Sequence, residues 1–149
     1  MKKIFSEKEI KEIAEVVLSC AQKSKSKKAV VVALQGDLGA GKTTLSQAIA
    51  KKLGIKEKVI SPTFVIMKNY ELRVTNYEFK KLIHIDAYRL EKDKELLNLG
   101  WKEMISNPEN LILIEWPERV AKIIPKDSIR IKLSHEGDLS RCIDIVFSK

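Results

Sequence analysis

Apolar residues near the start of the chain recur at the spacing of an amphipathic helix. They are Ile10, Ile13, Ala14, Val17, Leu18 and Ala21. Ser6 and Glu9 precede this run at capping-box spacing, in which each side chain accepts a hydrogen bond from the other residue's free backbone N–H. The pattern predicts a first helix with one face against the core.

Three nearly uninterrupted apolar runs predict strands that are buried on both faces. Residues 29–34 form the first run, and residues 82–86 and 111–115 form two more that each end in an acid. Runs of this kind are typical of parallel sheets that helices cover on both sides.

Shorter patterns lie between these runs. Residues 45–53 and 93–99 have helical character, and each segment stops at a glycine. Residues 64–70 predict a further strand, and the polar stretch 71–80 predicts a turn or hairpin.

The last third of the chain alternates apolar and polar positions in two segments, which is the pattern of antiparallel strands. The turn residues Glu136-Gly137-Asp138 separate the two segments, whose apolar members are Ile129, Ile131, Leu133, Ile143, Ile145 and Phe147. The sequence therefore predicts one α/β domain over residues 1–149. Its expected form is a mostly parallel sheet flanked by helices, with an antiparallel C-terminal hairpin.

Composition places the chain among ordinary globular proteins and excludes few functions. Of 149 residues 44% are hydrophobic, and no apolar run approaches the ~20 residues that a membrane-spanning helix needs. The first residues turn polar at once, so we expect no signal peptide, no membrane association and a cytoplasmic location.

The net charge of +8 comes from lysines spread along the chain, so it does not by itself indicate direct binding of RNA. Cys20 and Cys142 are too far apart in sequence for a metal motif, and we expect both to be small buried residues.

The strongest chemical signal is a glycine-rich segment directly after the first predicted strand. Gly36-Asp37-Leu38-Gly39-Ala40-Gly41-Lys42-Thr43 matches G-x-x-x-x-G-K-[ST] in full and opens a predicted helix. In this motif successive backbone N–H groups and the helix N-terminus converge on phosphate oxygens. Lys42 would reach the β- and γ-phosphates, and the Thr43 hydroxyl would ligate Mg²⁺. The sequence thus predicts a P-loop nucleotide site.

Two acids follow apolar strands and are expected at the edge of the sheet where the loop lies. Asp86 and Glu115 would both sit at strand carboxyl ends, the usual ligand edge of open α/β sheets. One would lie near the metal and the other would polarise the attacking water, and spacing alone does not assign the roles.

Three further residues have open roles. Thr63, in Ser61-Pro62-Thr63, stands where phosphate-switch proteins sense the γ-phosphate, although the same triplet also forms ordinary turns. Trp116 follows Glu115 and would either join the core or face the nucleotide. His84 is expected to be a packed, hydrogen-bonded histidine, and His135 a surface residue near the last turn.

Four blocks of sequence, in order, carry a family resemblance over essentially the whole chain. They are Gly36–Thr44, Ser61-Pro62-Thr63-Phe64, His84-Ile85-Asp86-Ala87-Tyr88-Arg89 and Glu115-Trp116-Pro117. Together they resemble the bacterial TsaE (YjeE) family of ATPases of tRNA threonylcarbamoyladenosine biosynthesis. The loop alone is unspecific, whereas the four blocks in order are highly specific.

The resemblance implies a P-loop domain that binds ATP and Mg²⁺ and hydrolyses ATP slowly by itself. It implies work with the partner proteins TsaD and TsaB, which modify the adenosine beside the anticodon of tRNAs reading ANN codons, with TsaC supplying threonylcarbamoyl-adenylate. Contact with tRNA would come through this complex. The ATPase cycle would reset the transferase between turnovers rather than transfer the threonylcarbamoyl group.

The resemblance also implies roles for single residues. Lys42, Asp86 and Glu115 form the catalytic set, with Thr43 and Glu115 on the magnesium side and Asp86 as the catalytic or switch carboxylate. The expected nucleotide contacts are Gly36, Gly39, Ala40, Gly41, Lys42, Thr43, Thr44, the switch residue Thr63, and Trp116.

The resemblance further suggests how the cycle would work and where this chain departs from the family. ATP and Mg²⁺ would order residues 61–64 and the partner-facing surface, and hydrolysis would release them. Arg89 is a candidate arginine for the transferred phosphate, unless the partner supplies one. Family members often have threonine where this chain has Ile10, so a base contact from that helix is not expected, and residues 71–80 match no family pattern.

Three other readings remain open on sequence alone. A small-molecule P-loop kinase usually carries an arginine-rich lid, and this chain has few arginines. A GTPase would need an Asn-Lys-x-Asp segment, which the chain lacks. A nucleotide-dependent interaction module would need ATP only as a ligand.

Overall fold

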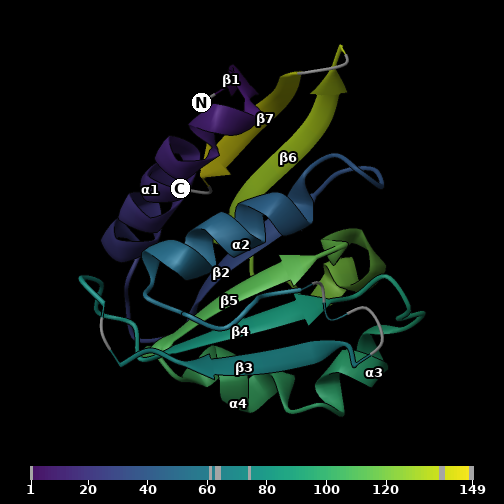
Figure 1. The fold of residues 1–149 in the computed structure, drawn as a ribbon. Coiled ribbons are helices and arrows are strands. Elements are labelled where there is room, and N and C mark those ends of the chain that lie inside the picture. The colour runs from purple at the N-terminus through teal and green to yellow at the C-terminus, as the bar shows by residue number, and fades with distance from the viewer. Residues whose placement is uncertain (1, 61, 63–64, 74, 138–139, 148–149) are drawn as a thin grey trace.

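A mixed sheet of seven strands forms the centre of the described part of the protein (Figure 1). The computed structural model describes residues 2–60, 62, 65–73, 75–137 and 140–147. The strand order is β1-β7-β6-β2-β5-β4-β3. The strands are β1 (Lys2–Ser6), β2 (Val30–Gln35), β3 (Met67–Glu71), β4 (Lys81–Asp86), β5 (Asn110–Glu115), β6 (Ile129–Glu136) and β7 (Ser140–Phe147).

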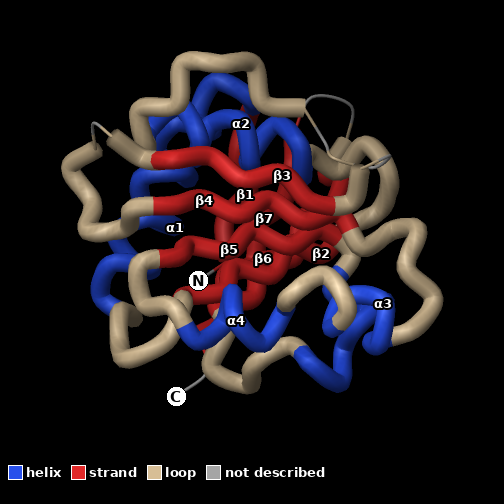
Figure 2. Tube along the Cα trace, turned by 90° about the horizontal axis from the view of Figure 1, so that it is seen from below, coloured by secondary structure: helices blue, strands red, loops and turns tan. Residues whose placement is uncertain are grey.

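Helices cover the sheet on both faces, so the protein has three layers (Figure 2). On one face lie the two longer helices, α1 (Ile10–Lys23) and α2 (Lys42–Lys52). On the other face lie the short helices α3 (Asp93–Leu97) and α4 (Trp101–Ser106), with the 3₁₀ segment η2 (Pro117–Ile123). A second 3₁₀ turn, η1 (Glu7–Glu9), leads into α1.

Strand β2 shows why the central strands are apolar throughout. Val30, Val32 and Leu34 pack in the layer under α1 and α2, whereas Val31 and Ala33 pack under the short helices. Side chains of a strand alternate between the two faces, so most positions of a strand covered on both faces are apolar. The three buried strands predicted from apolar runs are confirmed as β2, β4 and β5.

The sheet is mixed rather than mostly parallel, which corrects the prediction. Strands β6, β2, β5 and β4 run parallel in the middle, but β7, β1 and β3 pair antiparallel outside them. The C-terminal hairpin was expected, and it is the pair β6–β7. The sequence did not predict β1, because Lys2–Ser6 is too short to show a periodic pattern; this strand forms by pairing with β7.

The first helix lies where its apolar spacing placed it, with Ile13, Ala14, Val17, Leu18 and Ala21 buried. The predicted capping contact forms only in part. The backbone N–H of Ser6 donates to Oε1 of Glu9 at 3.4 Å. The cap residue of α1 is Glu9 itself, without a side-chain cap, because η1 adds a turn before the helix.

The expected burial of the two cysteines is confirmed for one of them. Cys142 is buried as expected, but Cys20 is only half-buried, and this partial burial raises the pKa of the Cys20 thiol.

Within the described residues, no helix has the length and apolar character of a bilayer-crossing segment.

The connection between β3 and β4 closes an antiparallel hairpin, as the polar stretch 71–80 suggested, but it is anchored in the core. Phe79 is 1% exposed and belongs to the core layer of α1 and α2. The Lys25 ammonium lies 4.9 Å from the centre of the Phe79 ring, and it also donates to the carbonyl oxygen of Glu78. The connection therefore adds to stability as well as joining two strands.

We expect Phe79→Ala to lower the free energy of unfolding by about 3–5 kcal/mol, because a fully buried ring leaves a cavity. Urea denaturation followed by circular dichroism measures this loss. Arg73→Ala, an exposed change in the same connection, is the control and should stay within about 0.5 kcal/mol of wild type. Equal stabilities for the two variants would show that Phe79 is not part of the core.

Candidate functional site

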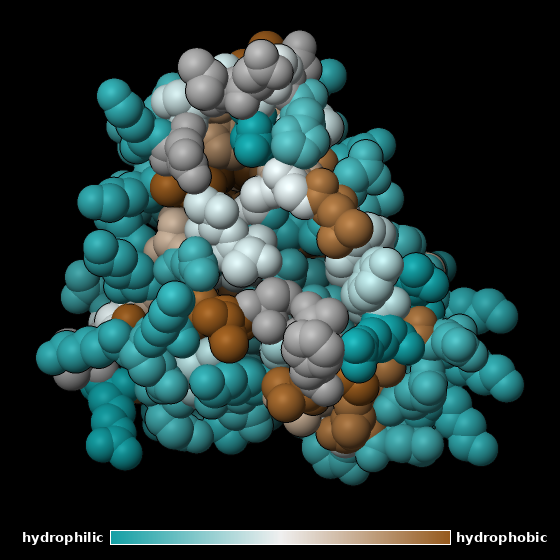
Figure 3. Space-filling model, turned by 45° about the vertical axis from the view of Figure 1, so that its right-hand side comes forward, coloured by the Kyte–Doolittle hydropathy of each residue, from teal (hydrophilic) through white to brown (hydrophobic). Residues whose placement is uncertain are grey.

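The glycine-rich loop lies at the carboxyl end of the central strand, between β2 and α2 (Figure 1). Strand β2 ends at Gln35 and α2 begins at Lys42. This is the strand–loop–helix setting that the motif requires. Figure 3 brings this edge forward and shows near-neutral and apolar residues gathered within a largely hydrophilic face.

Two glycines of the loop are required by its backbone. A Cβ on Gly36 would lie 2.6 Å from the carbonyl oxygen of Leu133 on β6, so only glycine fits between the loop and that strand. Gly41 caps α2 with a φ of 105°, in the left-handed region that favours glycine. No described side chain caps α2 by a hydrogen bond, and its first turn holds no acid.

Lys42, the first residue of α2, is buried, with 6% of its surface exposed. Its ammonium donates to the carbonyl oxygens of Gly36 and, at 3.1 Å, Asp37. The same ammonium lies 4.2 Å from the centre of the Trp116 ring. Burial lowers the pKa of Lys42, and nearby carboxylates, Glu115 first among them, partly oppose that shift. The loop thus holds a partly desolvated cation at its mouth.

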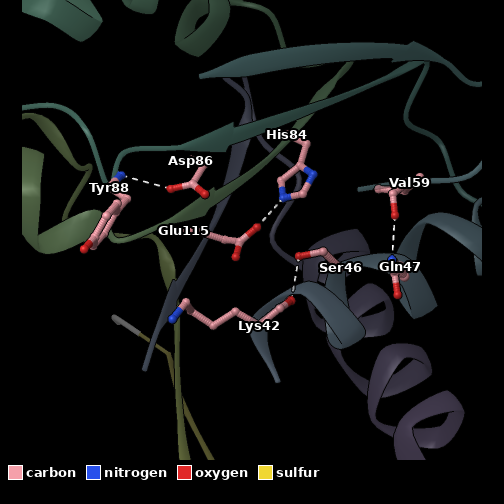
Figure 4. A network of polar contacts seen from close by, with 8 residues as sticks. All are labelled: Lys42, Ser46, Gln47, Val59, His84, Asp86, Tyr88 and Glu115. Atoms are coloured by element: carbon pink, nitrogen blue, oxygen red, sulfur yellow. Dashed lines mark hydrogen bonds and ion pairs between the residues drawn. The ribbon is translucent and has the colours of Figure 1, made fainter. Parts of the chain in front are cut away.

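The two predicted acids are neighbours. Asp86 and Glu115 are register partners at the ends of the parallel strands β4 and β5. They are 3% and 2% exposed, and they lie on the same side of the sheet as Lys42 (Figure 4). Oδ1 of Asp86 accepts from the backbone N–H of Tyr88 at 2.9 Å. The structure therefore brings together the three residues that the sequence named as a catalytic set.

His84 is packed and hydrogen-bonded, as expected, but its partner was not predicted. Its Nε2 lies 2.6 Å from Oε2 of Glu115, and both side chains are almost fully buried. Its other ring nitrogen, Nδ1, is buried and has no hydrogen-bond partner among the residues that the structure describes. The distance of thirty-one positions between His84 and Glu115 hid this contact from sequence reasoning.

Trp116 packs against the core, one of the two roles that the sequence left open, and its contact with the nucleotide stays a prediction. It packs against the core layer of the short helices, and one ring face meets the Lys42 ammonium. Its φ of 59° is unusual for a bulky residue and turns the chain sharply after β5. The Tyr88 ring lies 5.0 Å away, and the Arg119 guanidinium lies 5.4 Å from Tyr88.

The remaining predicted residues divide into three groups. Ala40 is buried in the loop, and Thr43 and Thr44 are half-buried in the first turn of α2. Thr63 lies outside the described residues, so its switch role stays a prediction. Arg89 is exposed in the turn after β4.

His135 is exposed, as expected, but it lies closer to the loop than its sequence position suggested. Its Nε2 lies 3.7 Å from where a Cβ on Gly39 would stand. The reason is topological, because β6, which carries His135, pairs directly with β2. No local signal in the sequence indicates this pairing.

Comparison with known proteins identifies the family. Residues 4–143 match the family model described as "Threonylcarbamoyl adenosine biosynthesis protein TsaE". The tRNA threonylcarbamoyladenosine biosynthesis protein TsaE of Haemophilus influenzae is 35% identical over 136 residues, which is 91% of this chain and 79% of that protein. The protein of the same name from Bacillus subtilis is 38% identical over 111 residues, or 74% of this chain and 65% of the relative.

A solved structure agrees with these relatives. The structure described as "Crystal structure of Bacillus subtilus YdiB" superposes with a TM-score of 0.74 and 30% sequence identity. The match covers 100% of this chain and 86% of that one. The chain therefore belongs to the TsaE family, whose members are named for threonylcarbamoyladenosine biosynthesis.

Proposed function

We propose that the protein is a cytoplasmic P-loop ATPase that binds ATP and Mg²⁺ at residues 36–44 and hydrolyses ATP slowly by itself. In this proposal it acts with TsaD and TsaB to support turnover of tRNA threonylcarbamoyladenosine synthesis. The observation that carries the proposal is the buried Lys42 ammonium at the mouth of the loop, opposite the paired acids Asp86 and Glu115.

The loop supplies what a triphosphate needs. The amides at the start of α2 have no capping side chain, and the helix directs its positive end at the same place. Lys42 is held by two carbonyl oxygens and a tryptophan face, which are weaker partners for an ammonium than phosphate oxygens. Lys42 is thus positioned to exchange these contacts for phosphate.

The oxygen donors beside the loop fit magnesium. The Thr43 hydroxyl and the Glu115 carboxylate are hard oxygen ligands, which Mg²⁺ prefers together with phosphate oxygens and water. The metal would supply neutralisation of the phosphate charge. We assign Glu115 to the metal side, because a hydrogen bond to His84 orients it, and we assign Asp86 to the attacking water.

Partner binding is proposed for the same edge of the sheet. Leu38 at the tip of the loop is 73% exposed, and Val65 and Tyr88 are 67% and 40% exposed. Leu38 follows β2, Tyr88 follows β4, and Val65 precedes β3, which is antiparallel to β4. All three therefore lie at the edge that carries the loop, where a partner would cover apolar surface close to the nucleotide.

We expect Lys42→Met to weaken ATP binding about 10- to 100-fold, because the variant loses charge-assisted hydrogen bonds. Its free energy of unfolding should equal or exceed that of wild type, since the folded protein holds the Lys42 charge at a cost. Titration calorimetry and urea denaturation measure the two quantities. Lys51→Met, an exposed change near the end of the same helix, should leave ATP affinity unchanged.

The difference in the free energy of unfolding between the wild type and Lys42→Met has a defined pH dependence. The pKa of Lys42 is lower in the folded chain than its ordinary value of 10.5, so between these values the unfolded chain binds more protons. In that interval the wild type gains stability relative to Lys42→Met as pH rises. Below it the difference is constant. A difference that moved against the wild type would show that Lys42 is not a buried cation.

Asp86→Asn and Glu115→Gln should still bind ATP but should hydrolyse it at least about 100-fold more slowly, because the first loses the proposed general base and the second loses the proposed carboxylate on the metal side. Glu109→Gln, at the opposite end of β5, is the matched control and should keep full turnover. Phosphate release and the threonylcarbamoyladenosine content of tRNA are the measurements. If tRNA modification persisted without hydrolysis, ATP would be only a ligand, and the ATPase role would be lost.

The tagged protein should co-purify with the TsaD–TsaB pair in larger amount when ATP is present, because the nucleotide and the exposed apolar residues share one edge. The amount of TsaD retained, with and without ATP, is the measurement. Lys42→Met should retain the lower amount in both conditions. Equal retention by wild type with and without ATP would contradict a nucleotide-dependent partnership.

A further inference from the structure

The pair formed by His84 and Glu115 is more than a packing contact. His84 lies inside β4, where its register partner is Leu113, and Glu115 is two residues further along β5. The two side chains therefore meet diagonally on the face that α2 covers. Their exposed side-chain fractions are 1% and 3%, and Nε2 and Oε2 are 2.6 Å apart.

The surroundings of the ring decide where its proton lies. An ionised carboxylate can only accept, so Nε2 must donate to Glu115. Nδ1 is buried, and no described residue offers it an acceptor, so a proton on that atom would be an unpaired buried donor within the described part of the chain. The tautomer that carries its proton on Nε2 and none on Nδ1 meets both conditions. An apolar side chain would serve packing better than a ring with one unsatisfied nitrogen.

We propose that His84 is a positioning residue for Glu115. Its Nε2–H holds Oε2, and Figure 4 shows the other carboxylate oxygen turned toward Lys42 and the loop. The hydrogen bond thereby selects one rotamer of Glu115 and presents the free oxygen where the proposed function puts nucleotide-bound magnesium. Hydrogen bonds of this kind behind a ligating carboxylate are a common way to orient it. The inference rests on that proposed function.

The variants His84→Gln and His84→Phe separate donation from packing. Glutamine keeps an Nε2–H donor at similar reach, whereas phenylalanine fills the space without a donor. Ile83→Val is the matched control, because Ile83 is equally buried on the same strand but faces the opposite core layer.

The readout is the gain in ATP affinity that Mg²⁺ provides, measured by calorimetry in EDTA and in excess Mg²⁺. We expect all four proteins to bind ATP alike in EDTA. In Mg²⁺, His84→Phe should lose about tenfold or more of the affinity gain, and His84→Gln and Ile83→Val should keep it. A full gain in folded His84→Phe, or a His84→Gln that behaves like His84→Phe, would overturn the proposal.

A second measurement needs no nucleotide and no variant. ¹⁵N NMR of the histidine rings in the wild-type protein should show His84 protonated at Nε2 and bare at Nδ1. A ring whose only proton is on Nδ1, with Nε2 bare, would overturn the positioning role, because Nε2 could then not donate to Glu115. If the wild type failed to bind ATP with Mg²⁺ at all, the proposed function would fall, whereas a normal wild type beside an unaffected His84→Phe would remove only the role of His84.

Discussion

A lysine charge buried beside carboxylates is the interaction around which the site is built. Taking an ammonium out of water costs several kcal/mol unless partners replace the lost hydration. In this protein the replacement is incomplete, because the partners are two loop carbonyl oxygens, an aromatic face and acids at nearby strand ends. The lowered pKa of Lys42 reflects that shortfall. A ligand with two or three negative charges would replace the missing hydration of the Lys42 ammonium. The buried charge that reduces the stability of the folded protein would therefore favour the binding of phosphate groups.

Strand order brings these groups together. Strand β2 delivers the loop, and its neighbour β5 and the next strand β4 deliver Glu115 and Asp86 to the same edge. Strand β6 pairs with β2 on the side away from β5, and its Leu133 carbonyl oxygen packs against Gly36 of the loop. Because parallel strands all end at one edge, residues separated by some thirty to eighty positions meet there without any local signal. The short helices on the opposite face complete the burial of these strands.

The features that local physics controls could be predicted from the sequence. The apolar runs of β2, β4 and β5 show that both faces are covered, and the glycine spacing at 36–41 reports a backbone that must curl. The features that depend on pairing between distant segments could not be predicted. Strand β1 exists only because β7 offers an edge, and the antiparallel outer strands made the sheet mixed rather than mostly parallel. The partner of His84 and the position of His135 beside Gly39 follow from register, which no periodic pattern records.

Strain at Trp116 adds an independent argument for the site. A bulky residue in the left-handed region costs about 1–3 kcal/mol and persists only where its surroundings hold it. Here the backbone N–H of Trp116 donates to the carbonyl oxygen of Leu34 at 3.3 Å, and that of Ala87 donates to the carbonyl oxygen of Glu115 at 3.0 Å. These bonds tie the ends of β2, β4 and β5 to one another just where Lys42 is buried. Three unfavourable features thus lie close together near one edge of the sheet: a desolvated cation, a strained tryptophan and a histidine nitrogen with no partner among the described residues. A packing role alone explains none of them, whereas a site that must hold charge in a fixed geometry requires groups of this kind.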